Sequence, residues 1–145
     1  MQNKGITVLI IHGPNLHLLG KREPSIYGSF SLEDINHKLE EKALAKGFNL
    51  IICQSNSESE IVDKITNAEF DYLIINPAAY THTSVAIRDA ILGVNKPTLE
   101  VHISNIHKRE EFRKKSMISD VVAGVITGLG IDSYLLALEA LPLQQ

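Results

Sequence analysis

Five short runs of apolar residues recur along this chain, and most of them are continuously hydrophobic rather than alternating with polar residues. A continuous run rich in branched side chains is typical of a strand that is covered on both faces, as in a parallel sheet. We therefore predict five strands. They cover residues 7–11, 49–53, 72–76, 98–103 and 121–127.

Helical patterns separate these runs, and two of them begin with a capping signature. Ser31 precedes an acidic pair, and Ser57 stands three residues before Glu60. A serine at this spacing from an acidic residue satisfies the free N–H groups at the start of a helix. One predicted helix begins at Ser31 and ends at Gly47, and a second begins at Ser57. Three more are predicted over residues 84–94, 111–115 (a short helix) and 133–141.

The alternation of strands and helices predicts an α/β protein with right-handed crossovers and a parallel sheet. Five strands suit a flavodoxin-like three-layer fold, with the strand order 2-1-3-4-5 and helices on both faces of the sheet. The length of 145 residues predicts a single flavodoxin-like catalytic domain over residues 1–145. Ligands of such folds bind beyond the carboxyl ends of the strands.

One connection, residues 13–30, has no hydrophobic period and is rich in glycine and proline. Loops of this length are uncommon in compact domains and often serve as active-site lids. Polar residues in this loop and after the third and fourth strands should therefore meet at one edge of the sheet. They are Asn15, Arg22, Tyr27, Asn76, His82, Glu100, His102, Ser104 and Arg113.

This set holds acids and bases but no activated nucleophile, which indicates proton transfer on a small anionic substrate. Glu100 and His102 lie two residues apart on a strand, so their side chains point to the same face. A carboxylate beside an imidazole favours the charged ring and fixes its orientation, which suits a general acid.

Composition and missing motifs exclude several other classes. The net charge of −3 and the lack of a basic stripe argue against nucleic acid, and no apolar segment is long enough to span a membrane. Without a signal-peptide pattern, we expect a cytoplasmic protein. The single cysteine, Cys53, lies in an apolar run and is expected to be buried and unreactive. The basic residues over 108–115 suggest a solvated face, although one arginine there could bind a substrate.

Cofactor and metal signatures are also missing. The sequence has no phosphate-binding loop, no nucleophile elbow, no H-E-x-x-H and no cysteine pair, so we expect no cofactor and no metal. Two alternatives remain open. One is a flavin- or nucleotide-binding module on the same fold, and the other is a non-catalytic assembly protein.

Several longer motifs, in order and in register from about residue 8 to residue 141, resemble those of type II 3-dehydroquinate dehydratase. The segments that carry this likeness are Gly13-Pro14-Asn15-Leu16, Arg22-Glu23-Pro24-Ser25-Ile26-Tyr27-Gly28, Gln54-Ser55-Asn56-Ser57-Glu58, Thr81-His82-Thr83-Ser84 and Glu100-Val101-His102-Ile103-Ser104-Asn105. The resemblance implies a metal-independent lyase that removes water from 3-dehydroquinate through an enolate and gives 3-dehydroshikimate, in aromatic biosynthesis or in quinate breakdown.

The resemblance also implies roles for individual residues. Tyr27 resembles the general base and His102 the general acid, while Asn15 resembles the group that stabilises the enolate and Arg22 the lid residue that supports the base. The residues that resemble substrate-binding groups are Asn76, His82, Asp89, Ile103, Ser104 and Arg113.

The family assembles trimers into dodecamers, so the resemblance implies a homo-oligomer in which Asp89 reaches a neighbouring site. Two positions depart from the family pattern. His17 stands where the family usually has asparagine, and Ala78 stands where glycine is frequent. Neither position has an assigned chemical role, so we expect effects on rate and affinity only.

Overall fold

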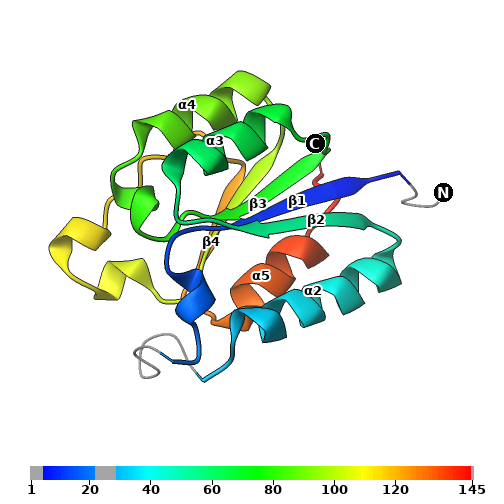
Figure 1. The fold of residues 1–145 in the computed structure, drawn as a ribbon, viewed down its shortest axis with the longest axis horizontal. Coiled ribbons are helices and arrows are strands. Elements are labelled where there is room, and N and C mark those ends of the chain that lie inside the picture. Colours follow the sequence, from blue (N-terminus) through cyan, green and yellow to red (C-terminus); the bar gives the residue numbers. More distant parts are fainter. Residues whose placement is uncertain (1–4, 22–28, 145) are drawn as a thin grey trace.

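The structure is a computed structural model that describes residues 5–21 and 29–144. Five parallel strands form one sheet in the order β2-β1-β3-β4-β5, which confirms the predicted order and fold class (Figure 1). The strands are β1 (Thr7–His12), β2 (Asn49–Gln54), β3 (Tyr72–Asn76), β4 (Thr98–His102) and β5 (Gly124–Thr127).

Helices cover both faces of the sheet, α3 and α4 on one side and α2 and α5 on the other (Figure 1). Their bounds are α2 (Leu32–Lys46), α3 (Glu58–Asn67), α4 (Val85–Val94) and α5 (Ile131–Glu139). Ser31 forms a capping box at the start of α2, and Gly47 ends this helix with a left-handed φ of 77°. Ser57 caps α3 by accepting a hydrogen bond from the N–H of Glu60, as its spacing predicts.

The continuous apolar run of β1 has a direct structural reason. Val8 and Ile10 pack in the cluster beneath α2 and α5, whereas Leu9 and Ile11 pack in the cluster beneath α3 and α4. All four side chains are fully buried. A central strand with a core on each face needs an apolar residue at every position.

The structure corrects the expected bounds in the second half of the chain. The last strand begins at Gly124, because its pairing with β4 begins there, and Val121 and Val122 cover the core from a loop instead. Residues 111–115 form only a single 3-10 turn, η4 (Glu111–Arg113), instead of a short helix. The last helix begins at Ile131, two residues before its predicted start.

Cys53 is half-buried rather than buried, because β2 is an edge strand. Burial nevertheless raises the pKa of its thiol, in keeping with an unreactive cysteine. In the part of the chain that the structure describes, we find no helix long and apolar enough to cross a membrane.

Candidate active site

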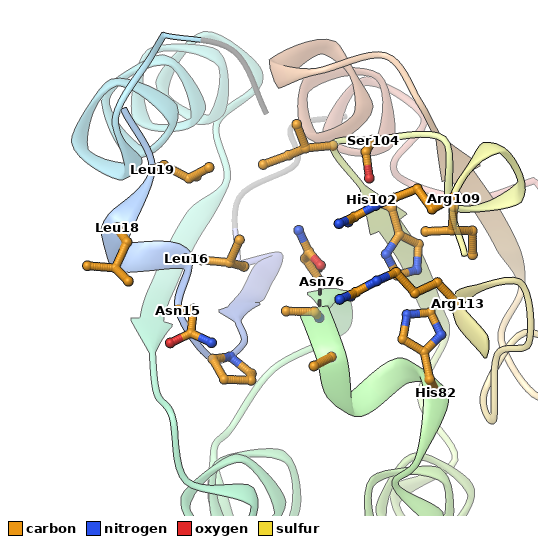
Figure 2. A pocket seen from close by; sticks show the side chains of 15 residues that line it. Asn15, Leu16, Leu18, Leu19, Asn76, His82, His102, Ser104, Arg109 and Arg113 are labelled. Carbon is orange, nitrogen blue, oxygen red and sulfur yellow. Dashed lines mark hydrogen bonds between the residues drawn. The ribbon is translucent and has the colours of Figure 1, made fainter. Parts of the chain in front are cut away.

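A pocket of about 160 Å³ opens at the carboxyl ends of β1, β3 and β4. The segment after β1 forms one wall, and the segment after β4 forms the opposite wall (Figure 2). Asn76 lies between these walls at the end of β3 (Figure 2). The parallel sheet thus brings together the strand ends at which the sequence predicted a site.

The wall after β1 depends on a close approach between two strand ends. Gly13 donates its N–H to the carbonyl oxygen of Asn76 at 2.7 Å. A Cβ at Gly13 would lie only 2.4 Å from the carbonyl oxygen of Pro77, so no larger residue fits there. Asn15 follows with a left-handed φ of 70°, and its N–H donates to Oδ1 of Asn56 at 3.0 Å.

Asn76 is almost fully buried, and other residues hold its amide. Its Oδ1 accepts from the N–H of Ala78 at 3.0 Å, and its Nδ2 donates to the hydroxyl of Tyr134 at 3.1 Å. Ala78, which replaces a frequent glycine of the resembled family, has a left-handed φ of 54°. Such a conformation strains a residue with a side chain.

Glu100 and His102 form a buried pair, as their spacing predicted, and His102 lines the pocket. Nε2 of His102 lies 2.6 Å from Oε2 of Glu100. The hydroxyls of Ser116 and Ser119 donate to the same carboxylate at 3.0 Å and 2.8 Å. Burial favours the neutral acid, but these hydrogen bonds and the charge of His102 outweigh it and lower the pKa of Glu100. The carboxylate is therefore ionised, and it accepts the hydrogen bond from Nε2 of His102.

His82 and Arg113 line the side of the pocket next to His102 (Figure 2). Nδ1 of His82 donates to the carbonyl oxygen of Lys115 at 2.7 Å, which leaves Nε2 for a ligand. Burial lowers the pKa of His82, so this ring is neutral near pH 7. Nε of Arg113 donates to Oε1 of Glu110 at 2.9 Å.

Residues of β5, and of the turn that follows β5, hold the segment after β4 in place. The hydroxyl of Thr127 donates to the carbonyl oxygen of Ser104 at 2.9 Å. Gly128 has a φ of 93°, and a Cβ there would lie 3.0 Å from Cβ of Asn105. Gly128, in the run Gly128-Leu129-Gly130 that resembles half of a nucleotide-binding motif, thus serves the packing of this loop.

The pocket brings together most of the residues that the sequence singled out. Those that line it are Asn15, Asn76, His82, His102, Ile103, Ser104 and Arg113. Glu100 lies behind His102, and Asp89 is exposed on α4 and does not line this pocket. Arg22 and Tyr27 lie outside the described residues.

Sequence reasoning missed Arg109, which lines the pocket four residues before Arg113. The only signal was the basic cluster over 108–115, which was interpreted as a solvated face in which one arginine could bind a substrate. The apolar lining from Leu16, Leu18, Leu19 and Ile106 was missed as well. Among the described residues, no three His, Cys, Asp or Glu side chains are grouped so that they could hold a metal ion.

Comparison with known proteins gives one family. A family model described as Dehydroquinase class II matches residues 6–142. The 3-dehydroquinate dehydratase of Cellvibrio japonicus is 58% identical over 137 residues, covering 92% of this chain and 93% of the relative. The enzyme of the same name from Pseudomonas savastanoi pv. phaseolicola is 56% identical over 137 residues, covering 92% of this chain and 91% of the relative.

A solved structure agrees with these sequence matches. The crystal structure of a type II dehydroquinase from Butyrivibrio crossotus superimposes with a TM-score of 0.91 at 43% identity, covering 92% of this chain and 95% of the other.

Proposed function

This chain belongs to the class II dehydroquinase family, and we propose that it eliminates water from 3-dehydroquinate to give 3-dehydroshikimate. The observation that carries this proposal is the ionised Glu100 held 2.6 Å from His102, which lines the pocket together with two arginines and Asn76. The flavin- or nucleotide-binding alternative has no support from the comparisons, and Pro14 leaves the turn after β1 without one of the N–H groups that such a site needs.

The reaction needs two proton transfers. A base removes the proton at C-2, and its electron pair forms an enolate whose charge rests on the oxygen at C-3. The enolate then collapses to a C-1/C-2 double bond and restores the ketone, while the hydroxyl at C-1 takes a proton and leaves as water. The base has gained a proton and the acid has lost one, so a return transfer completes the cycle.

Tyr27 is the base that we assign, with Arg22 as its support. A free tyrosine has a pKa near 10, and ionising it at neutral pH requires about 4 kcal/mol. One guanidinium at ~4 Å supplies roughly this amount at an effective dielectric constant of ~20. Arg22 precedes Tyr27 by five residues on the same loop, and Arg109 and Arg113 add positive charge to the pocket.

His102 is the acid that we assign, with Glu100 as its partner. Because Nε2 of His102 is hydrogen-bonded to Glu100, Nδ1 is the atom that would donate to the leaving hydroxyl. The ionised carboxylate accepts from Nε2 of His102 and fixes the plane of the ring. General acids and bases of this kind typically contribute 10²- to 10⁴-fold to a rate.

The remaining pocket residues are assigned to binding. Asn15 would stabilise the enolate through a water molecule, and Arg113 would bind the substrate carboxylate, for which a guanidinium is well suited. The other groups that would hold the ring oxygens are the side chains of Asn76 and His82 and the backbone and hydroxyl of Ile103 and Ser104.

The proposal also covers the oligomeric state, the cellular compartment and the pathway. Asp89 is exposed on α4, so it is free to reach the site of a neighbouring copy in a homo-oligomer built from trimers, a dodecamer in its complete form. We propose one catalytic domain that works in the cytoplasm without metal or cofactor, in aromatic biosynthesis or quinate breakdown.

The test is the absorbance of the conjugated enone product after addition of 3-dehydroquinate, with a chelator present. Wild type should form the enone at a steady rate. Tyr27→Phe should reduce kcat by at least about 10²-fold, while Tyr80→Phe, whose hydroxyl donates to the carbonyl oxygen of Asn56 outside the pocket lining, should keep the wild-type rate. No enone with wild type, or full activity in Tyr27→Phe, would contradict the proposal.

A further inference from the structure

A buried chain of hydrogen bonds runs from α2 to the floor of the pocket. Nε2 of His12 lies 2.8 Å from Oδ1 of Asn36, and Nδ1 of His12 lies 2.9 Å from the hydroxyl oxygen of Tyr134. That hydroxyl accepts from Nδ2 of Asn76 at 3.1 Å. His12 and Tyr134 are both 0% exposed, so water cannot replace either partner. Neither side chain lines the pocket.

The direction of every bond in this chain follows from one backbone group. The N–H of Ala78 can only donate, so the amide atom of Asn76 that faces it, 3.0 Å away, is the oxygen. The other amide atom is then the nitrogen, which donates to Tyr134. The hydroxyl hydrogen of Tyr134 must therefore go to Nδ1 of His12.

His12 is consequently neutral, with its proton on Nε2, from which it donates to Asn36. Burial supports this state, because it lowers the pKa of His12 and raises that of Tyr134. Every buried side-chain nitrogen and oxygen in the described residues has a hydrogen-bond partner. A reversed Asn76 amide would break this pattern, because its Nδ2 donor would face the N–H donor of Ala78.

We propose that His12 and Tyr134 are positioning residues for Asn76, which fix its amide so that the pocket meets an N–H donor and not the carbonyl oxygen. Oδ1 is held by Ala78 and one Nδ2 hydrogen by Tyr134, so the second Nδ2 hydrogen is left for the pocket that Asn76 lines (Figure 2). The ligand group that fits is an acceptor oxygen, such as a hydroxyl or carboxylate oxygen of a small polyhydroxylated acid. The identity of this acid rests on the proposed function.

Tyr134→Phe is the direct test, because it removes the hydroxyl and keeps the packed ring. We assign Asn76 to substrate binding and not to the proton transfers, so we expect KM for 3-dehydroquinate to rise about 10-fold, with kcat changed less than about 2-fold. The matched control is Tyr72→Phe, which removes a hydroxyl from the opposite end of β3 and should change neither constant.

A pair of substitutions at His12 separates positioning from packing. His12→Leu keeps most of the volume but offers Tyr134 no acceptor, so KM should rise as in Tyr134→Phe. His12→Asn places an acceptor oxygen at the δ position, so its KM should lie closer to that of wild type. If Tyr134→Phe lowers only the melting temperature and leaves KM unchanged, the two residues are structural and the proposal is overturned.

Nitrogen NMR of the His12 ring tests the chain independently of activity. We expect wild type to carry the proton on Nε2 and to lose the hydrogen bond at Nδ1 in Tyr134→Phe. A proton on Nδ1 would overturn the proposal even in an active enzyme. A wild type that does not convert 3-dehydroquinate, but shows the expected ring state, would contradict the proposed function and leave the positioning of Asn76 supported.

Discussion

Acid should destabilise this protein through His12. The ring is fully buried and its neighbours in the chain of hydrogen bonds, Asn36 and Tyr134, are uncharged. Burial therefore lowers the pKa of His12 from 6.5 to about 4, only partly opposed by the hydrogen bond to Asn36. In the unfolded chain the ring takes up its proton near pH 6.5, whereas the folded protein resists it down to about pH 4.

The sign and size of the effect follow from this difference. The unfolded state binds more protons than the folded state between these two pH values, so the free energy of unfolding falls as pH falls from 6.5 towards 4. At 1.36 kcal/mol for each pKa unit, His12 accounts for a loss of about 2 kcal/mol by pH 5 and about 3 kcal/mol by pH 4. Above pH 7 the contribution is complete, and below pH 4 the loss no longer grows.

Urea unfolding of wild type and His12→Asn, at one protein concentration and at several pH values, measures this contribution. His12→Asn should be less stable than wild type at pH 7, and the difference should shrink by about 2 kcal/mol at pH 5 because the variant has no buried ring to protonate. His37→Asn is the matched control, since His37 is exposed on the same helix as Asn36. A constant difference between wild type and His12→Asn across this pH range would refute the reasoning.

Three further substitutions test the site. Gly13→Ala places a Cβ 2.4 Å from the carbonyl oxygen of Pro77, so the free energy of unfolding should fall by roughly 1–3 kcal/mol in urea, and kcat should fall with it. Ala78→Gly relieves a φ of 54° and should raise the free energy of unfolding by up to about 1 kcal/mol; a loss would show that the backbone is unstrained. Ser119→Ala removes a donor from the carboxylate of Glu100 and therefore raises the pKa of that carboxylate. The stability that the ionised carboxylate gives above its unfolded pKa should then be lost at a higher pH during acid titration. An unchanged acid transition would argue against the pair of Glu100 and His102.

The sheet could be predicted from the sequence because the burial of each strand leaves a pattern within the sequence of that strand. A central strand such as β1 needs an apolar residue at every position, and this leaves a visible run. The same rule misplaced the start of β5, since Val121 and Val122 are apolar for a different reason: they cover the core from a loop. A run of hydrophobic residues indicates burial, but it does not indicate which backbone groups form hydrogen bonds between strands.

The candidate site was predictable where parallel strands gather their ends, as for Asn76 and His102. Arg109 was not, because its place in the pocket depends on the path of the loop after β4, which Thr127 fixes from another strand. The contact between His12 and Tyr134 joins positions 122 residues apart, and nothing local in either segment indicates it.

The division of roles between Tyr27 and His102 is tested most directly with 3-dehydroquinate that carries deuterium at C-2. In His102→Ala, the base should still form the enolate, so deuterium should be lost to solvent faster than enone is produced. Tyr27→Phe should show neither loss of deuterium nor enone. Loss of deuterium from Tyr27→Phe at the wild-type rate would contradict the account, because another group would then be removing the proton.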